Sequence, residues 1–523
     1  MKKTFKRAGV AVLSMAMLIS MGAVGAMTAS AAPVTVTLTT ASTDLANKNC
    51  TYEYWKVANN QNAAETKFTS LFDGVGASGV TIGSNNYTTI ASIAAKEASG
   101  TSFTETEKKQ MADKIAKFIS DNSVAADGSG STTSNTASLS VEPGWYFIKT
   151  ATTDASVFAQ PVLVYITAAQ TVTVKTQTIG VQKTINEVKR ADGSTSNENK
   201  TTETAYVGVG DRVQFKVVTN FPDYSSEVVS GKSVTEEFVI NDIPSAGLNA
   251  DITAANVVVK VNGNVIDSGY TVGEALTQKD VDGSTDVAAT APTNGISVTF
   301  DDATVLANLT KPVEVTYYAD VLNTAVIGSA GNNNTAYLNY GHDYYTSGSK
   351  KILKDDANVY TAKITLVKED SEDNTKKLEG VVFTLKDNST NMYLAVDGTE
   401  SDTATNFTTG AGGVIEFNRI PAGTFTLHEV STIANYKMLD HDITFTVVAG
   451  QASSQYDGTV TVTTTDTSAS ATGATITVVN PPAKSLPGTG GMGTVLFTVG
   501  GAAIVLLAGA MFVVYMRRRK NEE

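Results

Sequence analysis

Short segments of alternating hydrophobic and polar residues recur along most of the chain. Strict alternation over four to eight residues is typical of a β-strand with one buried face. Turn residues such as Asn262-Gly263 and Asp192-Gly193 separate the segments and tolerate the positive φ that tight hairpins need. The pattern therefore predicts a mainly β protein built from immunoglobulin-like sandwiches. The clearest alternating segments are residues 171–174, 212–217, 361–368 and 443–447.

One segment near the N-terminus has helical spacing instead. Between Ser102 and Ile119, the apolar residues Met111 and Ile115 are four positions apart, with charged residues between them. Thr104 precedes Glu107 at the spacing of a capping box, in which each residue satisfies a backbone N–H of the first helical turn. We expect one helix here, within the first domain.

The first 31 residues have the layout of a secretory signal peptide. A basic start, containing Lys2 and Arg7, is followed by an apolar run from about residue 8 to residue 24. Small residues close the run at 29–32 and form a cleavage site of the A-x-A type. Because the apolar core is short, cleavage after Ala31 or Ala32 is favoured over retention as a membrane anchor. The mature chain is then secreted.

The C-terminus has three consecutive parts. The pentapeptide Leu486-Pro487-Gly488-Thr489-Gly490 comes first, and an uncharged stretch at 494–516 is long enough to span a bilayer. The basic tail at 517–523 belongs on the cytoplasmic side. Together these parts resemble the sortase sorting signal of Gram-positive surface proteins. The resemblance implies that sortase cleaves after Thr489 and joins it to an amine of another subunit or of a peptidoglycan precursor, while the span is a transient membrane tether.

The region between these ends is long enough for three domains. The positions of helical and strand patterns predict domains at 32–178, 179–361 and 362–482. The only cysteine of the sequence, Cys50, excludes an internal disulfide, so rigidity must come from elsewhere. Cys50 is interpreted as a buried small apolar residue, with a stray thiol as the alternative.

Composition excludes several function classes. The formal net charge of −13 argues against a nucleic-acid partner. The three histidines, His342, His428 and His441, lack metal-ligand spacing, so no metal or cofactor is expected. The glycine-containing segments 208–210 and 410–413 are interpreted as turns rather than as a dinucleotide fingerprint. A secreted hydrolase is therefore disfavoured.

Four segments in the predicted third domain carry a family resemblance. They resemble the collagen-adhesin B-type domain found in the backbone pilins of sortase-assembled Gram-positive pili. Phe425 stands where the family has tyrosine, and residues 434–436 depart from its usual Pro-x-Gly-Tyr loop. The resemblance implies an isopeptide bond between Lys368 and Asn480, assisted by Glu429. The segments are 364–370, 378–385, 423–429 and 475–480.

The predicted second domain resembles the isopeptide-forming middle domain of the same pilins. The segments that carry this resemblance are 181–185, 238–248 and 334–340. The resemblance implies a bond between Lys183 and Asn334, assisted by Asp242. Asn333 and Asn332 stand one and two residues from the motif position, and strand alternation allows Asn332 to share the inward face.

Burial explains why such residues could react. It disfavours the charged form of each group, so it lowers the pKa of a lysine and raises that of a carboxylic acid. A neutral amine can then attack an amide carbon while the protonated acid polarises the carbonyl and helps protonate the departing ammonia. This is a single reaction of each domain on itself, not enzyme activity in the usual sense. The alternatives are a solvated strand lysine and a buried ion pair without a covalent bond.

The resemblance implies the major shaft subunit of a covalent pilus, with sortase, identical subunits, and tip and basal pilins as partners. Polymerisation needs a reactive lysine near the end of the first domain. The segment Val172-Thr173-Val174-Lys175-Thr176 lacks the Tyr-Pro of the family motif, and Lys175 is the candidate. A monomeric wall-anchored adhesin or basal pilin, binding a host or matrix ligand, remains the alternative at this point.

Overall fold

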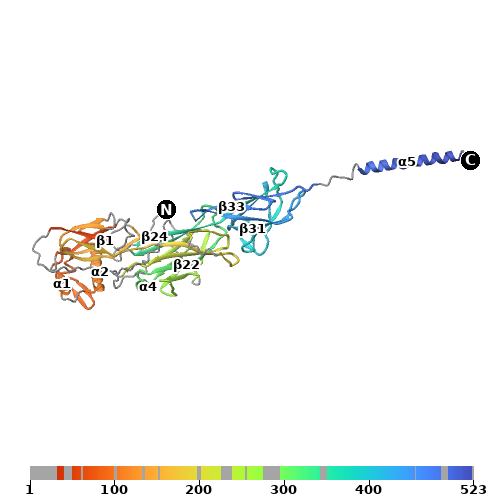
Figure 1. Cartoon of the computed structure of the whole chain (residues 1–523). Coiled ribbons are helices and arrows are strands. Elements are labelled where there is room, and N and C mark those ends of the chain that lie inside the picture. Colours follow the sequence, from red (N-terminus) through yellow and green to blue (C-terminus); the bar gives the residue numbers. More distant parts are fainter. Residues whose placement is uncertain are drawn as a thin grey trace.

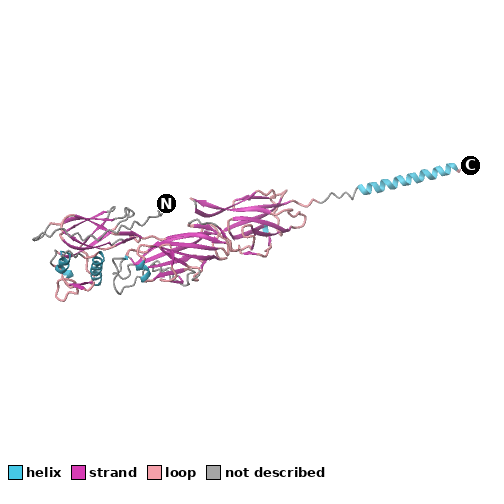
Figure 2. Ribbon diagram, turned by 60° about the horizontal axis from the view of Figure 1, so that its bottom comes forward, coloured by secondary structure: helices cyan, strands magenta, loops and turns pink. Residues whose placement is uncertain are grey.

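A computed structural model describes most of the chain between residues 32 and 520. The described residues are 32–40, 50–59, 63–98, 103–131, 136–150, 154–196, 202–224, 238–253, 256–274, 295–341, 350–453, 455–484 and 493–520. The predicted signal peptide and the pentapeptide at 486–490 lie outside the described residues. Strands dominate and fall into three groups of sheets, called here the first, second and third units, which lie end to end (Figures 1 and 2).

The first unit pairs a small sandwich with a helical cap. One sheet has the order β10-β1-β6 and another β5-β2-β7-β9, while β11 pairs with β8 and β3 with β4. The strands are β1 Val34–Thr40, β2 Thr51–Ala58, β3 Val80–Ile82, β4 Asn85–Tyr87, β5 Gly128–Ser131, β6 Thr136–Val141, β7 Gly144–Thr150, β8 Val157–Ala159, β9 Val162–Ile166, β10 Gln170–Val174 and β11 Thr176–Thr178, and a 3-10 turn, η2, covers Thr66–Phe68.

Two helices pack on one side of this unit (Figure 2). The predicted helix is confirmed as α2, Glu105–Asp121, and Thr104 and Glu107 form the expected capping box. A second helix, α1, Ile90–Ala98, was not identified from the sequence because it is short and rich in alanine. Cys50 is buried in the sandwich core beside the two sheets, as its interpretation required.

The second unit is a sandwich of two larger sheets. One has the order β13-β12-β15-β22-β18-β19, with β17 on β22, and the other has the order β14-β24-β23-β16-β21-β20. Its elements are β12 Gln182–Lys189, β13 Thr195–Ser196, β14 Thr204–Tyr206, β15 Arg212–Asn220, β16 Phe238–Pro244, β17 Leu248–Ala250, β18 Val258–Val261, β19 Asn264–Val265, β20 Tyr270–Glu274, β21 Ile296–Phe300, α4 Asp302–Ala307, β22 Pro312–Val321, β23 Asn332–Gly341 and β24 Lys350–Tyr360.

The third unit is a smaller sandwich. Its sheets have the orders β30-β25-β35-β34 and β28-β27-β26-β31-β32-β33, with β29 on β26. Its elements are β25 Ala362–Asp370, β26 Val382–Asp387, β27 Tyr393–Leu394, β28 Glu400–Ser401, β29 Phe407–Thr408, η5 Ala411–Gly413, β30 Val414–Ile420, β31 Gly423–Ser431, β32 Ile443–Ala452, β33 Gln455–Thr464, β34 Ala469–Thr472 and β35 Thr475–Asn480.

The local signals of the sequence are confirmed. Three of the alternating segments lie wholly in strands, β10, β15 and β32, and the segment 361–368 lies in β25 from Ala362 onward. Asn262 and Gly263 have φ of 53° and 82° and turn the β18–β19 hairpin, as their residue types predict.

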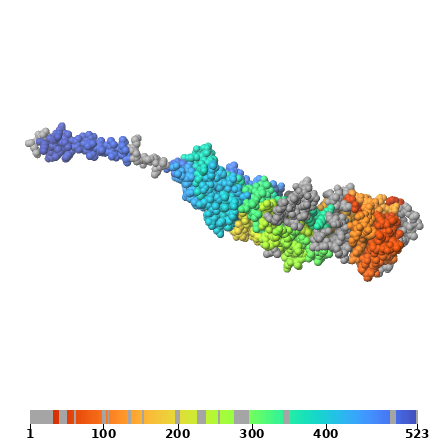
Figure 3. Space-filling view, turned by 180° about the vertical axis from the view of Figure 1, so that it is seen from behind, coloured from red at the N-terminus to blue at the C-terminus, as the bar shows by residue number. Residues whose placement is uncertain are grey.

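Beyond the third unit, α5, Gly493–Arg519, stands apart from the sandwiches (Figure 3). The helical segment 494–519 is long and apolar enough to cross a membrane.

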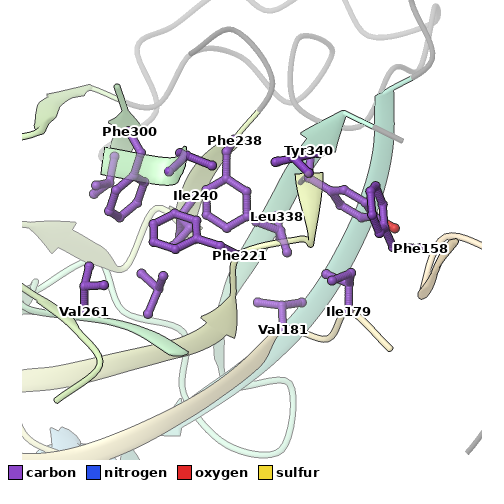
Figure 4. Packing of buried hydrophobic residues seen from close by; sticks show 14 of the residues in the cluster. Phe158, Ile179, Val181, Phe221, Phe238, Ile240, Val261, Phe300, Leu338 and Tyr340 are labelled. Atoms are coloured by element: carbon purple, nitrogen blue, oxygen red, sulfur yellow. The ribbon is translucent and has the colours of Figure 1, made fainter. Parts of the chain in front are cut away.

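Adjacent units are joined by packed contacts. Aromatic and aliphatic side chains of the second unit continue past Val181 and Ile179 to Phe158 of the first (Figure 4). The rings of Phe158 and Tyr224 meet edge to face with centroids 5.4 Å apart. Between the second and third units, Thr361 is fully buried where β24 continues into β25.

A buried charge cluster also joins the second and third units. Arg190 contacts Asp211 of its own unit at 3.2 Å, and Asp387 and Glu400 of the third unit at 2.9 and 3.4 Å. The side chains of all four residues are at most 10% exposed. Three carboxyl groups therefore share one guanidinium at this junction.

Candidate functional site

Lys183 lies inside the core of the second unit. It occupies an inward position of β12, opposite Val217 of β15, and its side chain is fully buried. Its ammonium nitrogen is 4.5 Å from the centre of the Phe215 ring and 5.5 Å from that of Tyr317. Lysine is almost never fully buried unless it is paired, so this position points to a specific role.

The partners of Lys183 come from the facing sheet. Asp242 on β16 is paired with Ala336 of β23, and Asn334 is two residues from Ala336 on the same strand. Since side chains two residues apart share a face, Asp242 and Asn334 are diagonal neighbours that point into the core. Lys183 Nζ donates a hydrogen bond to Asp242 Oδ2, and both residues are fully buried.

Tyr317 of β22 completes this cluster. Asn334 Nδ2 donates to the Tyr317 hydroxyl at 2.7 Å, and Lys183 Nζ reaches the same hydroxyl at 3.5 Å. Asp242 Oδ1 and Asn334 Oδ1 are buried and have no hydrogen-bond partner among the described residues. A proton on the Asp242 carboxyl would convert one of these two acceptors into a donor. Sequence reasoning missed Tyr317 because it occupies an inward strand position where core packing is the default.

The structure separates the three neighbouring asparagines. Asn333 is exposed, and its Nδ2 donates a hydrogen bond to the Thr335 hydroxyl. Asn332 is buried, but it exchanges hydrogen bonds of 2.7 and 3.0 Å with the backbone of Val326 and so braces a turn. Asn334 is the one of the three that lies in the cluster with Lys183.

Electrostatics in the second unit favour neutral groups. Burial lowers the pKa of Lys183 and raises the pKa of Asp242, and their mutual attraction opposes both shifts. Compared with the same groups in water, both pKa shifts favour the neutral amine of Lys183 and the neutral carboxylic acid of Asp242 over the ion pair. The result is a lysine with increased amine character beside a carboxylic acid, which is what attack on an amide requires.

The third unit brings its lysine and asparagine together on neighbouring strands. β25 and β35 run parallel, with Lys368 opposite Val478 and Asp370 opposite Asn480. Lys368 and Asn480 are fully buried and point to the same face. Lys368 Nζ donates to the Val478 carbonyl at 3.3 Å. The lysine is therefore held beside the strand that carries the asparagine.

Glu429 reaches this site from the facing sheet. It lies on β31, and its Oε1 accepts a 2.6 Å hydrogen bond from Asn480 Nδ2. Its Oε2 accepts from the Leu439 backbone N–H at 2.8 Å, which fixes the carboxyl group. Asn480 Nδ2 also donates to the Thr432 hydroxyl at 3.0 Å, a contact that the sequence motif did not indicate. Burial lowers the pKa of Lys368 to about 8, so a substantial fraction is neutral near physiological pH.

Comparison with known proteins identifies the C-terminal third of the chain. Residues 362–468 match the family described as a prealbumin-like fold domain, and residues 478–523 match the LPXTG cell wall anchor motif. No curated protein sequence matches the chain. A backbone pilin of Streptococcus pyogenes with a modular three-domain structure is 14% identical, covers 87% of this chain and 99% of its own, and superposes with a TM-score of 0.54.

The chain is a wall-anchored protein with a pilin fold. Two major pilins of Corynebacterium diphtheriae also resemble it. One is 15% identical, with 87% of this chain and 98% of its own covered and a TM-score of 0.47. The other is 14% identical, with 86% and 100% covered and a TM-score of 0.48. The anchor motif places the pilin fold at the cell surface, attached to the wall.

Lys175, the predicted polymerising lysine, belongs to the first unit. Lys175 is half-buried between β10 and β11, and its carbonyl accepts from the Gln160 N–H at 3.0 Å. Two residues along the chain, Gln177 Nε2 donates to the Phe221 carbonyl of the second unit at 2.9 Å. Lys175 is thus close to the junction of the first two units.

Among the described residues, no group of three or more His, Cys, Asp or Glu side chains could hold a metal ion.

Proposed function

We propose that this protein is the major shaft subunit of a covalently polymerised pilus, stiffened by self-formed bonds between Lys183 and Asn334 and between Lys368 and Asn480. One observation carries the proposal: two separate cores each bury a lysine, an acid and an asparagine at one site. Chance burial of one such set would be costly, because an unreacted charge in a core loses several kcal/mol of hydration. A covalent amide would remove the charge permanently.

The positions of these residues suit a shaft under tension. Each lysine lies on the first strand of its unit, and each asparagine lies on the last strand or the one before it. The bonds would close loops of about 150 and about 110 residues, which by analogy with disulfides removes about 4–5 kcal/mol of unfolded-state entropy each. Force along the chain would then load a covalent bond, and no disulfide is needed.

The mass of the purified protein tests the bonds directly. A fragment from Val34 to Lys484 should weigh less than its sequence mass by two ammonia molecules, one for each bond. Tryptic peptides should then contain the two lysine–asparagine cross-links. A fragment at its full sequence mass would contradict the proposed isopeptide bonds and leave only buried polar clusters. A third ammonia loss would locate an additional bond outside the two sites.

Polymerisation is the second part of the proposal. Sortase would cleave after Thr489 and transfer its carbonyl to Lys175 of the next subunit. Tip pilins, basal pilins and a peptidoglycan precursor would be the other donors or acceptors in this transfer. Lys175→Arg keeps the charge but removes the reactive amine. Wall extracts of this variant should contain folded monomer and lose the detergent-resistant ladder of multimers, together with the branched peptide that joins Thr489 to Lys175.

The matched control is Lys149→Arg, which changes a half-buried lysine of the same unit on β7. It should leave the ladder intact. A ladder that survives Lys175→Arg means that another lysine polymerises. Wild-type wall extracts without any ladder would favour a monomeric wall-anchored adhesin instead.

A further inference from the structure

The two sites differ in what touches the nitrogen that must leave. In the third unit, Glu429 itself accepts from Asn480 Nδ2 at 2.6 Å. In the second unit, the partner of Asn334 Nδ2 among the described residues is the Tyr317 hydroxyl, at 2.7 Å. Asp242 instead contacts Lys183, whose Nζ lies 3.5 Å from the same Tyr317 hydroxyl. The tyrosine hydroxyl therefore lies between the asparagine nitrogen and the lysine that contacts the acid.

An amide nitrogen leaves readily only after it gains a proton. A hydroxyl suits this task because it can accept a hydrogen bond from the planar amide and then donate its own proton once that nitrogen becomes tetrahedral. The Tyr317 hydroxyl remains protonated until it is used, since burial raises its pKa well above the ordinary value of a phenol. Its ring is fully buried and packs 5.9 Å from that of Phe215, which holds the hydroxyl in place.

We propose that Tyr317 is a catalytic residue of the second unit, which carries a proton from Asp242 to the departing nitrogen of Asn334. This inference rests on the proposed function, because it assigns a step in the formation of the Lys183–Asn334 bond. In the third unit, the direct contact of Glu429 makes such an intermediary unnecessary.

The step balances without an added reagent. Asp242 first takes a proton from the Lys183 ammonium, and the free amine then forms a bond to Asn334 Cγ while the carbonyl electron pair moves to Oδ1. Tyr317 gives its proton to Nδ2 and recovers one from Asp242. The Cγ–Nδ2 bond breaks with its electron pair on nitrogen, ammonia departs, and the carbonyl reforms. The surplus proton of the attacking nitrogen returns to Asp242, which ends as a neutral acid beside the new amide.

The test follows bond formation in the full chain, made by cell-free synthesis in the presence of detergent. Cross-linked tryptic peptides are quantified against time by mass spectrometry. Tyr317→Phe retains the ring and removes the hydroxyl, and it should slow the Lys183–Asn334 bond by about a hundredfold or more, the usual contribution of a general acid. The Lys368–Asn480 bond of the same molecule should form at its normal rate and report that the chain is intact.

Tyr318→Phe is the matched control. Tyr318 is the next residue on β22, and its hydroxyl donates to Glu187, outside the cluster. This variant should form both bonds at the wild-type rate. If Tyr317→Phe forms the Lys183–Asn334 bond at the wild-type rate, the proposal for Tyr317 is overturned. If the wild-type chain never forms that bond, the proposed function itself fails.

A second variant covers the case in which Tyr317→Phe does not fold. Difluorotyrosine at position 317 preserves the shape and the hydroxyl but makes its proton easier to donate. It should accelerate the Lys183–Asn334 bond several-fold and leave the Lys368–Asn480 bond unchanged. A purely structural tyrosine would not respond in this way, so an unchanged rate overturns the proposal.

Discussion

The second and third units assemble the same residue types in two different arrangements. In the second, Lys183 lies on one sheet while Asp242 and Asn334 lie on the other, so a bond would cross the core. In the third, Lys368 and Asn480 lie on adjacent strands of one sheet, and Glu429 faces them from the other. Burial of a lysine near an amide and a source of protons is what the sites share, whereas the strand arrangement is free to differ.

The arrangement also changes how each lysine is held. Lys183 is hydrogen-bonded to its carboxyl partner, whereas Lys368 donates to the backbone carbonyl of Val478. In the second unit, the lysine can lose its proton directly to the acid. In the third, the lysine depends more on its low pKa and on exchange with its surroundings.

Removal of the acid should produce the largest effects, and they should be unequal. Asp242→Ala should abolish the Lys183–Asn334 bond and also leave a buried lysine without its carboxylate, which costs about 3–5 kcal/mol in addition to the loss of loop closure. Glu429→Ala should abolish the Lys368–Asn480 bond but leave no broken hydrogen-bonded ion pair. Mass loss, melting temperature and protease resistance measure both variants.

Each variant should lose one ammonia release and keep the other, and the two effects should add because the sites lie in separate units. Glu416→Ala is a suitable control, since this carboxylate contacts Lys363 at the surface, away from both sites. Equal destabilisation by Asp242→Ala and Glu429→Ala would show that the direct ion pair in the second unit contributes nothing extra.

The pH dependence of bond formation should separate the sites by a smaller factor. The pKa of Lys368 is about 8, so its reactive neutral fraction increases about tenfold for each pH unit below that value and levels off above it. The rate of the Lys368–Asn480 bond should follow this increase. The Lys183–Asn334 bond should change little, because the proton moves within the buried pair. Time courses at several pH values between 6 and 9, with both bonds quantified in the same sample at each pH, measure the two rates. Parallel pH profiles of the two rates would contradict this difference between the sites.

The smallest effect is expected at the junction between the two units. Burial raises the pKa of Glu400 to about 7 and that of Asp211 to about 6, so the folded protein keeps these protons at pH values where the unfolded chain has released them. The stability they contribute is therefore full below about pH 4 and is lost as the pH rises through 7. Thermal unfolding should show this decrease.

Glu400→Gln should flatten the decrease between pH 5 and pH 8 while both isopeptide bonds form normally. Glu379→Gln, at an exposed position of the same unit, is the control and should leave the pH profile unchanged. A Glu400→Gln profile as steep as that of the wild type would mean that the junction does not couple protonation to stability.

The sequence by itself determined the features that depend on near neighbours in the chain. Alternation predicted the strands, Asn262-Gly263 predicted a hairpin, and Thr104 with Glu107 predicted the start of α2, because each signal acts within a few residues. The motifs also placed Lys183, Asp242 and Asn334 at inward strand positions, since the side-chain period of a strand is two.

Only the tertiary structure decided which of these groups meet. The register of β16 against β23 sets Asp242 diagonal to Asn334, and the packing of one sheet on the other places the Tyr317 hydroxyl on the asparagine nitrogen. The same holds for Arg190, whose carboxylate partners include residues about 200 positions away. Strand register and the orientation of packed sheets are set by many distant contacts acting together, and no local pattern of residues contains them.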